Sequence, residues 1–239
     1  MPSSLRELDN PAWTSLTGPH ARFALRHGKA RRYPAAIAPF VAVPDVLDGQ
    51  VWRDLAALAG PGSLVSLADP AGMPPEHWEA VSAVRGVQLD GSAVFGAPDH
   101  EAVRLTAADV PEMLELVART KPGPFRSRTI ELGTYLGIRR DGELIAMAGE
   151  RLHPPGWTEI SAVCTDQRYR GQGLATRLVF ALAAEIRSRG ETPFMHAAAD
   201  NIGAIRLYES LGFRLRRPRR FVSATVPGAE PVTGPACPP

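Results

Sequence analysis

The second half of the chain predicts a mixed α/β fold on two main observations. Strand-like runs over 133–139 and 143–150 flank Arg140-Asp141-Gly142, and an Asp-Gly pair between such runs is typical of a β-hairpin. A further strand candidate over 158–165 leads through a glycine-containing turn into 174–189, where apolar residues recur at helical spacing. Strands and helices therefore alternate over a domain of about 125 residues.

The elements before and after these runs follow from local signals. Thr106 is a candidate helix N-cap after a short strand over 102–105, and Asp109 three residues later gives a capping-box pattern. Gly190 suits the end of the long helix. A strand over 194–199 and a capped helix over 202–210 come next, and closing strands are expected over 213–215 and 221–225. A basic cluster in this region is expected to be a solvated hairpin turn, with contact to nucleic acid or to a ligand phosphate as the alternative; its members are Arg214, Arg216, Arg217, Arg219 and Arg220.

The first part of the chain gives weaker signals. Residues 1–98 are rich in Pro and Gly, with apolar runs over 37–43 and 63–67 and a helical pattern over 51–59. The stretch 95–99 has the composition of a linker. The expected division is an N-terminal accessory domain over 1–98, a second domain over 99–226 and a disordered Pro/Gly-rich tail over 227–239.

Composition excludes several classes of protein. The 239 residues carry 27 Lys+Arg and 25 Asp+Glu, a formal net charge of +2, which argues against nucleic-acid binding through overall charge. Two cysteines make no disulfide framework, six scattered histidines predict no metal site, and no apolar run is long enough to span a membrane. We expect a cytoplasmic chain, and the near-absence of lysine favours a bacterial source with a G+C-rich genome.

One loop carries the chemical signal, in the segment Val163–Thr176. Gly171 and Gly173 allow the backbone to approach a ligand closely. The helix that follows directs free N–H groups and its positive dipole end into the turn, and Arg168 and Arg170 add positive charge. The segment predicts a pyrophosphate cradle. A Rossmann site would need a third glycine where Thr176 stands, and no Walker A sequence occurs.

The spacing Arg168-x-x-Gly171-x-Gly173 resembles the acyl-CoA motif of the GCN5-related N-acetyltransferases, the GNAT superfamily. Asn201-x-x-Ala204-x-x-Leu207-Tyr208-Glu209-x-x-Gly212-Phe213 resembles the second signature of that superfamily, and 144–151 with 190–196 resemble its FR47-like branch. The resemblance covers about 101–225. It implies a mixed, mostly antiparallel central sheet flanked by helices, with an N-terminal accessory α/β domain that is compatible with a degenerate half of the same fold.

The resemblance also implies a reaction and its residues. An acetyl group would pass from acetyl-CoA directly to a primary amine, with no metal, Tyr208 as general acid and Glu159 or Glu150 as candidate base. Cys164 should face the core, although it lies within the binding strand. The expected acetyl-CoA-binding residues are Val163, Cys164, Thr165, Arg168, Arg170, Gly171, Gln172, Gly173, Leu174, Ala175, Thr176, Asn201, Ala204 and Tyr208.

The sequence therefore leaves two hypotheses for the function. The first is an N-acetyltransferase that acts on a small-molecule or protein amine. The alternative is a catalytically silent CoA-binding or nucleic-acid-associated regulatory module. Neither reading involves a membrane partner, and a homodimer is compatible with both.

Overall fold

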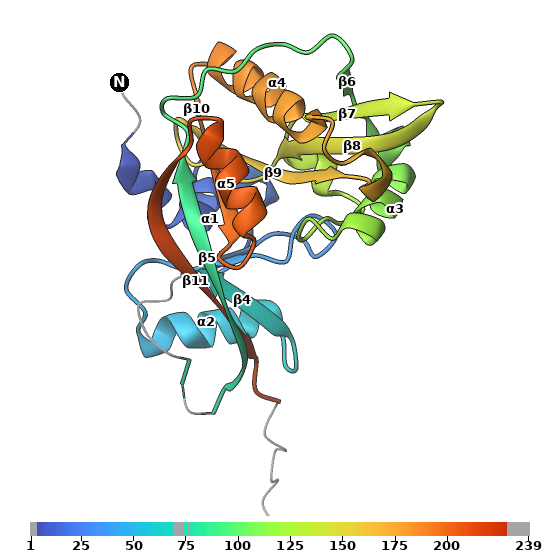
Figure 1. Ribbon diagram of the computed structural model, residues 1–239. Coiled ribbons are helices and arrows are strands. Elements are labelled where there is room, and N and C mark those ends of the chain that lie inside the picture. The colour runs from blue at the N-terminus through green and yellow to red at the C-terminus, as the bar shows by residue number, and fades with distance from the viewer. Residues whose placement is uncertain (1–3, 69–73, 76, 229–239) are drawn as a thin grey trace, which may run out of the picture.

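Two β-sheets organise the chain, and the larger one draws strands from both of the predicted parts. The computed structural model describes residues 4–68, 74–75 and 77–228 (Figure 1). The larger sheet has the strand order β4-β11-β5-β10-β9-β8-β7-β6, and the smaller has the order β1-β2-β3. The strands are β1 (Leu25–His27), β2 (Ala30–Arg32), β3 (Val41–Ala42), β4 (Leu64–Ala68), β5 (Glu79–Asp90), β6 (Val103–Arg104), β7 (Tyr135–Arg140), β8 (Glu143–Glu150), β9 (Trp157–Thr165), β10 (Thr192–Ala198) and β11 (Arg214–Thr225).

Helices cover both faces of the larger sheet. One face is covered by α4 and α5, whose apolar side chains share a core with Ile138, Ile145 and Ile160. The opposite face is covered by α3, whose Met113 and Leu116 pack with buried side chains of β7, β8 and β9. The helices are α1 (Pro11–Thr17), α2 (Gly49–Ala59), α3 (Val110–Thr120), α4 (Leu174–Ser188) and α5 (Ile202–Ser210), with 3-10 turns at Leu5–Leu8, Ala21–Phe23, Ala107–Asp109, Thr129–Leu132 and Gln167–Tyr169.

The expected mixed, mostly antiparallel sheet flanked by helices is confirmed. The pairing of β9 with β10 is parallel, and the other strand pairs recorded in this sheet are antiparallel. The predicted hairpin is β7–β8, and Asp141 at its turn has a φ of 50°. The capping box is also confirmed, because the Thr106 side chain accepts from the amide of Ala108 and Asp109 accepts from the amide of Thr106.

A strand from the N-terminal part completes the sheet. β5 lies between β10 and β11 and pairs antiparallel with both, so that Asp90 stands opposite Phe194 on one side and Arg214 on the other (Figure 1). The sheet therefore crosses the boundary predicted at residue 98. The N-terminal segment also packs on the start of β9 and β10, where Trp157 and Phe194 share a core with Leu8 and Leu16.

The expected hairpin turn between two closing strands is wrong. Residues 214–225 form one strand, β11, which pairs with β5 along its length and with β4 over its last five residues. Pro218 lies within this strand where β4 does not pair with β11, so its missing N–H removes no bond to β4. Arg216 donates to Asp9 and to the carbonyl of Leu5, which ties the strand to the N-terminal segment.

No helix of the described residues has the length and apolar character needed to cross a membrane. The predicted tail lies largely outside those residues, which end at Gly228.

Candidate active site

The two parallel strands of the larger sheet, β9 and β10, separate midway along their length. Their pairing runs from Thr192 opposite Trp157 to Met195 opposite Ile160, and no pair is recorded beyond that point in the described residues. A bulge in β9 accompanies the separation, because β9 advances three residues from Ser161 to Cys164 while β8 advances two. A bulge bends the strand and leaves backbone groups without a ladder partner. The split therefore exposes strand backbone to any molecule that enters it.

A cavity of about 490 Å³ occupies this split. Its walls include β9 residues Ser161, Ala162 and Val163, β10 residues Ala197 and Ala198, and α5 residues Asn201, Ala204 and Tyr208. Ala162 adopts a φ of 53° at the bulge, a conformation that costs free energy for a residue with a side chain and that clusters at functional sites.

Tyr208 brings a hydroxyl to the cavity from α5. Its side chain is 7% exposed, packs edge-to-face against Phe213 and lines the cavity. Burial raises the pKa of Tyr208 to about 12. The phenol is therefore protonated at neutral pH, as a general acid must be before it acts. No hydrogen bond of its hydroxyl is recorded within the described part of the chain.

The predicted phosphate cradle has the expected backbone geometry. Gly171 and Gly173 have φ values of 78° and 75°, and open space surrounds the position that a Cβ would occupy at each. Gly173 is the N-cap of α4, and no side chain caps this helix end. The first amides of a 15-residue helix thus face an open turn, the arrangement that binds phosphate groups in proteins. These groups fit the pyrophosphate of CoA.

The two arginines beside the cradle differ in their surroundings. Arg168 is held by carboxylates, since its Nη2 lies 2.6 Å from Glu143 Oε1 and its Nε lies 3.1 Å from Asp166 Oδ1. Hydrogen bonds from Arg168 hold the pKa of Asp166 at about 2. The guanidinium of Arg170 is exposed and makes a long contact of 3.4 Å with the carbonyl of Thr165. Arg168 therefore stabilises the turn through its carboxylate partners, and the guanidinium of Arg170 is the more available of the two for a ligand.

The remaining predicted binding residues divide by burial. Val163, Asn201 and Ala204 line the cavity, and Asn201 also caps α5 by accepting from the amide of Ala204 at 3.2 Å. Cys164 and Leu174 are buried in separate cores, so Leu174 can offer a ligand only its backbone. Burial raises the pKa of the Cys164 thiol to about 11, which argues against a nucleophilic thiolate. Gln172 is exposed, and Thr165, Ala175 and Thr176 are half-buried around the cradle.

Glu159, a candidate base, lies beneath the cavity wall. It is fully buried, and its carboxylate accepts from Arg151 Nε at 2.8 Å, Arg151 Nη2 at 2.6 Å and His196 Nδ1 at 2.7 Å. Burial alone would raise the pKa of Glu159, but the charge and hydrogen bonds of Arg151, together with the hydrogen bond from His196, outweigh it and lower the pKa below its ordinary range. Arg151 and His196 line the cavity, and Glu159 is not among the residues that do.

A side-chain relay fixes the tautomer of His196. Arg216 Nη1 donates to Gln88 Oε1 at 2.7 Å, and this contact orients the amide because arginine has no acceptor. Gln88 Nε2 then faces His196 Nε2 at 3.0 Å and must donate to it. The ring proton therefore lies on Nδ1 and points to Glu159. Burial lowers the pKa of His196, so the ring is neutral.

Glu150, the other candidate base, is buried in a different setting. Its Oε2 accepts from the amide of Thr134 at 3.1 Å, its Oε1 lies 2.7 Å from Arg189 Nη2, and His153 is adjacent. Glu150 is likewise not among the residues that line the cavity. The structure thus brings neither candidate carboxylate into the cavity, and separates Glu150 from the Arg151–Glu159–His196 group.

Sequence reasoning missed several cavity residues. Phe40 and Arg85 come from the N-terminal part, and Lys121 comes from the turn after α3. The alternation of Val87 and Leu89 with polar residues could have revealed β5, but local sequence carries no signal for its neighbours in the sheet.

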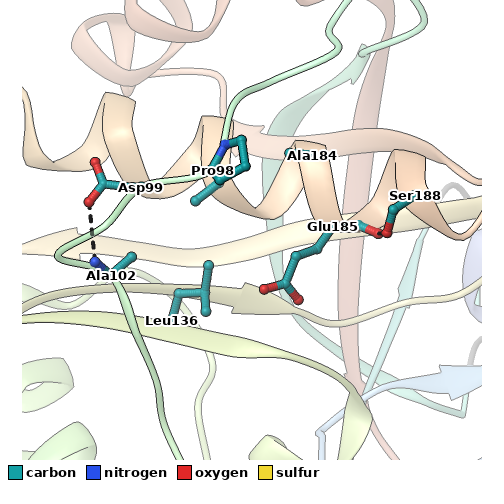
Figure 2. A pocket seen from close by; sticks show the side chains of 8 residues that line it. Pro98, Asp99, Ala102, Leu136, Ala184, Glu185 and Ser188 are labelled. Carbon is teal, nitrogen blue, oxygen red and sulfur yellow. Dashed lines mark hydrogen bonds between the residues drawn. The ribbon is translucent and has the colours of Figure 1, made fainter.

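A second hollow, of about 250 Å³, lies between α4 and the β6–β7 edge (Figure 2). Its carboxylates already have partners. Asp99 accepts from the amide of Ala102 and pairs with Arg177, and Glu185 pairs with Arg104. The cavity between β9 and β10 is therefore the candidate active site.

Comparisons with known proteins agree with this geometry. The family model of the FR47-like protein matches residues 135–222. An N-alpha-acetyltransferase RimI of Mycobacterium tuberculosis is 33% identical in an alignment of 141 residues that covers 54% of this chain and 87% of that protein.

Two solved structures extend the likeness to the N-terminal part. A putative GNAT-family acetyltransferase of Novosphingobium aromaticivorans is 38% identical with a TM-score of 0.84, covering 92% of this chain and 98% of that one. A GCN5-related N-acetyltransferase of Kribbella flavida shares the fold, with a TM-score of 0.59, 15% identity, and coverage of 91% of this chain and 96% of that one. The chain therefore belongs to the GNAT superfamily, in its FR47-like branch, and is an N-acyltransferase that uses an acyl-CoA.

Proposed function

We propose that the protein transfers the acetyl group of acetyl-CoA directly to a primary amine bound in the cavity between β9 and β10. The observation that carries this proposal is the split itself. The path that we propose runs from the uncapped helix amides at Gly173 back along the chain to the unpaired strand backbone at Val163, which shares the cavity with the phenol of Tyr208. Such a path suits a pyrophosphate, an extended amide-containing arm and a thioester in that order.

The residues present divide the work of binding. The cradle amides and Arg170 hold the phosphates. The unpaired backbone of β9 exchanges hydrogen bonds with the amide-containing arm of the CoA. Asn201 faces the same cavity from the start of α5. Acetyl-CoA supplies the acyl group as an activated thioester.

Tyr208 serves the leaving group. When the amine nitrogen bonds to the thioester carbon and the carbon–sulfur bond breaks, the phenol donates its proton to the departing sulfur. The nitrogen releases its second proton as the amide forms, and that proton restores the phenol. Because its pKa is raised to about 12, the phenol keeps its proton at neutral pH and has it available for the sulfur.

The amine must lose one proton before it attacks. Because Arg85, Lys121 and Arg151 line the cavity and no carboxylate of the described residues does, a bound ammonium is disfavoured and its pKa falls. We propose for Glu159 a positioning role, in which it holds Arg151 and His196 in place, rather than direct proton abstraction.

Calorimetry with acetyl-CoA and a thiol-release assay over a panel of amines test the proposal. Binding together with amine-dependent thiol release supports it. Binding without turnover on any amine would favour a silent CoA-binding module, and no binding would reject both functions.

A further inference from the structure

The charged side chains that line the cavity are all cationic. Among the described lining residues these are Arg85 on β5, Lys121 after α3 and Arg151 after β8, and neither an Asp nor a Glu joins them. Three segments far apart in sequence therefore place positive charge around one cavity. Charges gathered in this way, without counter-ions in the same wall, favour an anionic group on the ligand.

The cation at Arg151 is rigidly held and still has hydrogen-bonding capacity. Glu159 takes its Nε and Nη2, and the guanidinium lies over the ring of Phe40 at 5.1 Å. No partner of Nη1 is recorded in the described residues, and this residue lines the cavity. A fixed guanidinium with free N–H groups is well suited to a carboxylate.

Arg85 and Lys121 supply the excess charge. The charge of Arg151 is balanced by buried Glu159, whereas neither Arg85 nor Lys121 forms an ion pair with another described residue. Both are exposed at the cavity wall. An acceptor with a second positive charge, such as a diamine, would be repelled by this wall, and a neutral amine would gain nothing from it.

Building on the proposed acetyl transfer, we propose that the acceptor is a small amine that also carries a carboxylate, of the amino-acid class. Its carboxylate would contact Arg151, Arg85 and Lys121, and its amino group would face the thioester. This arrangement also favours the reaction, since neutralising the carboxylate removes the internal charge that keeps the ammonium of a free amino acid protonated.

Paired substrates test the charge recognition. Each of several L-amino acids is compared with its own carboxamide, and a diamine completes the panel. The measured quantity is the ratio of kcat/KM for acid over amide, in the wild type and in Lys121→Glu and Arg85→Glu. Comparing this ratio between proteins cancels the different intrinsic basicities of the two amines. We expect each reversal to lower the ratio about tenfold or more.

Matched variants separate charge from structure. Lys121→Arg and Arg85→Lys keep the charge and should keep the ratio, and Arg26→Glu makes the same reversal at an exposed residue that does not line the cavity. An unchanged ratio in both reversals, or a wild type that prefers amides or the diamine, would overturn the inference while the acetyltransferase function stands.

A binding measurement distinguishes the two proposals. Calorimetry of the CoA-bound protein with an N-acetyl-amino acid and with its amide needs no turnover. A preference for the acid that is lost in Lys121→Glu supports the inference. If that preference is found and yet no amine is acetylated, the proposed reaction is rejected and the inferred carboxylate recognition is kept. Equal affinity for acid and amide would reject the inference.

Discussion

Replacing Glu159 by Gln should destabilise the fold far more than the loss of a surface carboxylate. The side chain is fully buried, and both of its oxygens accept hydrogen bonds from Arg151, with a further bond from His196. A carboxamide has one acceptor oxygen and an NH₂ group. In either orientation its NH₂ meets a donor of Arg151, and the largely buried guanidinium loses its counter-charge.

The magnitude follows from the cost of an uncompensated buried charge. Breaking a buried ion pair on one side costs about 3–5 kcal/mol of unfolding free energy. For a chain of this size, each kcal/mol moves the midpoint by roughly 2–4 °C. We therefore expect the melting temperature of Glu159→Gln to fall by about 6–20 °C.

Chemical and thermal unfolding followed by circular dichroism measure the effect. The matched control is Glu112→Gln, which removes an ion pair with Arg139 at a carboxylate that is 42% exposed and should cost less than about 1 kcal/mol. The double variant Glu159→Leu with Arg151→Met removes both charges and should recover much of the loss. A Glu159→Gln variant no less stable than Glu112→Gln would refute the reasoning.

The same carboxylate predicts a dependence on pH. Because its folded-state pKa is lowered, its contribution is fully present above the ordinary glutamate value of about 4.3 and is lost as the pH falls through the lower folded-state value. The difference in unfolding free energy between the wild type and Glu159→Gln should be constant from pH 6 to 8. It should shrink under acidic conditions in which both proteins are still folded, and urea titrations at each pH would measure it.

Three further predictions concern the site. Tyr208→Phe should lower turnover by about 10²–10⁴-fold with CoA affinity nearly intact, and unchanged turnover in a thiol-release assay would remove the phenol from its role as acid. Gly173→Val should abolish CoA binding in calorimetry, whereas Gly142→Val, at a similar φ of 83° in the β7–β8 turn, should strain the backbone without affecting affinity. Gln88→Leu should remove the donor to His196 Nε2 while Glu159 keeps the ring proton on Nδ1, so NMR of the ring nitrogens should show a shift of the Nε2 signal; an unshifted Nε2 signal would contradict the relay.

The sequence predicts well those elements whose causes are local. The α5 range 202–210 agrees with the structure because Asn201 caps it and its cavity-lining residues Ala204 and Tyr208 follow helical spacing. The turn at Asp141-Gly142 and the capping box at Thr106 depend on residues within a few positions of each other. The glycine turn before α4, our proposed phosphate cradle, is predictable for the same reason, since its glycines and the helix start are contiguous.

The parts that depend on distant partners were not predictable. β5 needs β10 and β11 as neighbours. Its alternation of apolar and polar residues predicts a strand but does not predict which strands pair with it. The environment of Glu159 is also non-local, because Arg151 and His196 lie 8 and 37 positions away along the chain. Its position on the strand suggested a base in the cleft, whereas tertiary contacts make it a buried counter-ion.

The place of β5 in the sheet has a consequence for how the chain is made. Asp90 pairs with Phe194 and Arg214, residues that a ribosome adds more than 100 positions later. At about 5–20 residues per second, the wait is roughly 5–20 s. During that interval β5 has neither of its final neighbours, and unpaired strand edges invite association with other chains. We therefore expect the newly synthesised protein to depend on molecular chaperones until its last strand, β11, emerges from the ribosome.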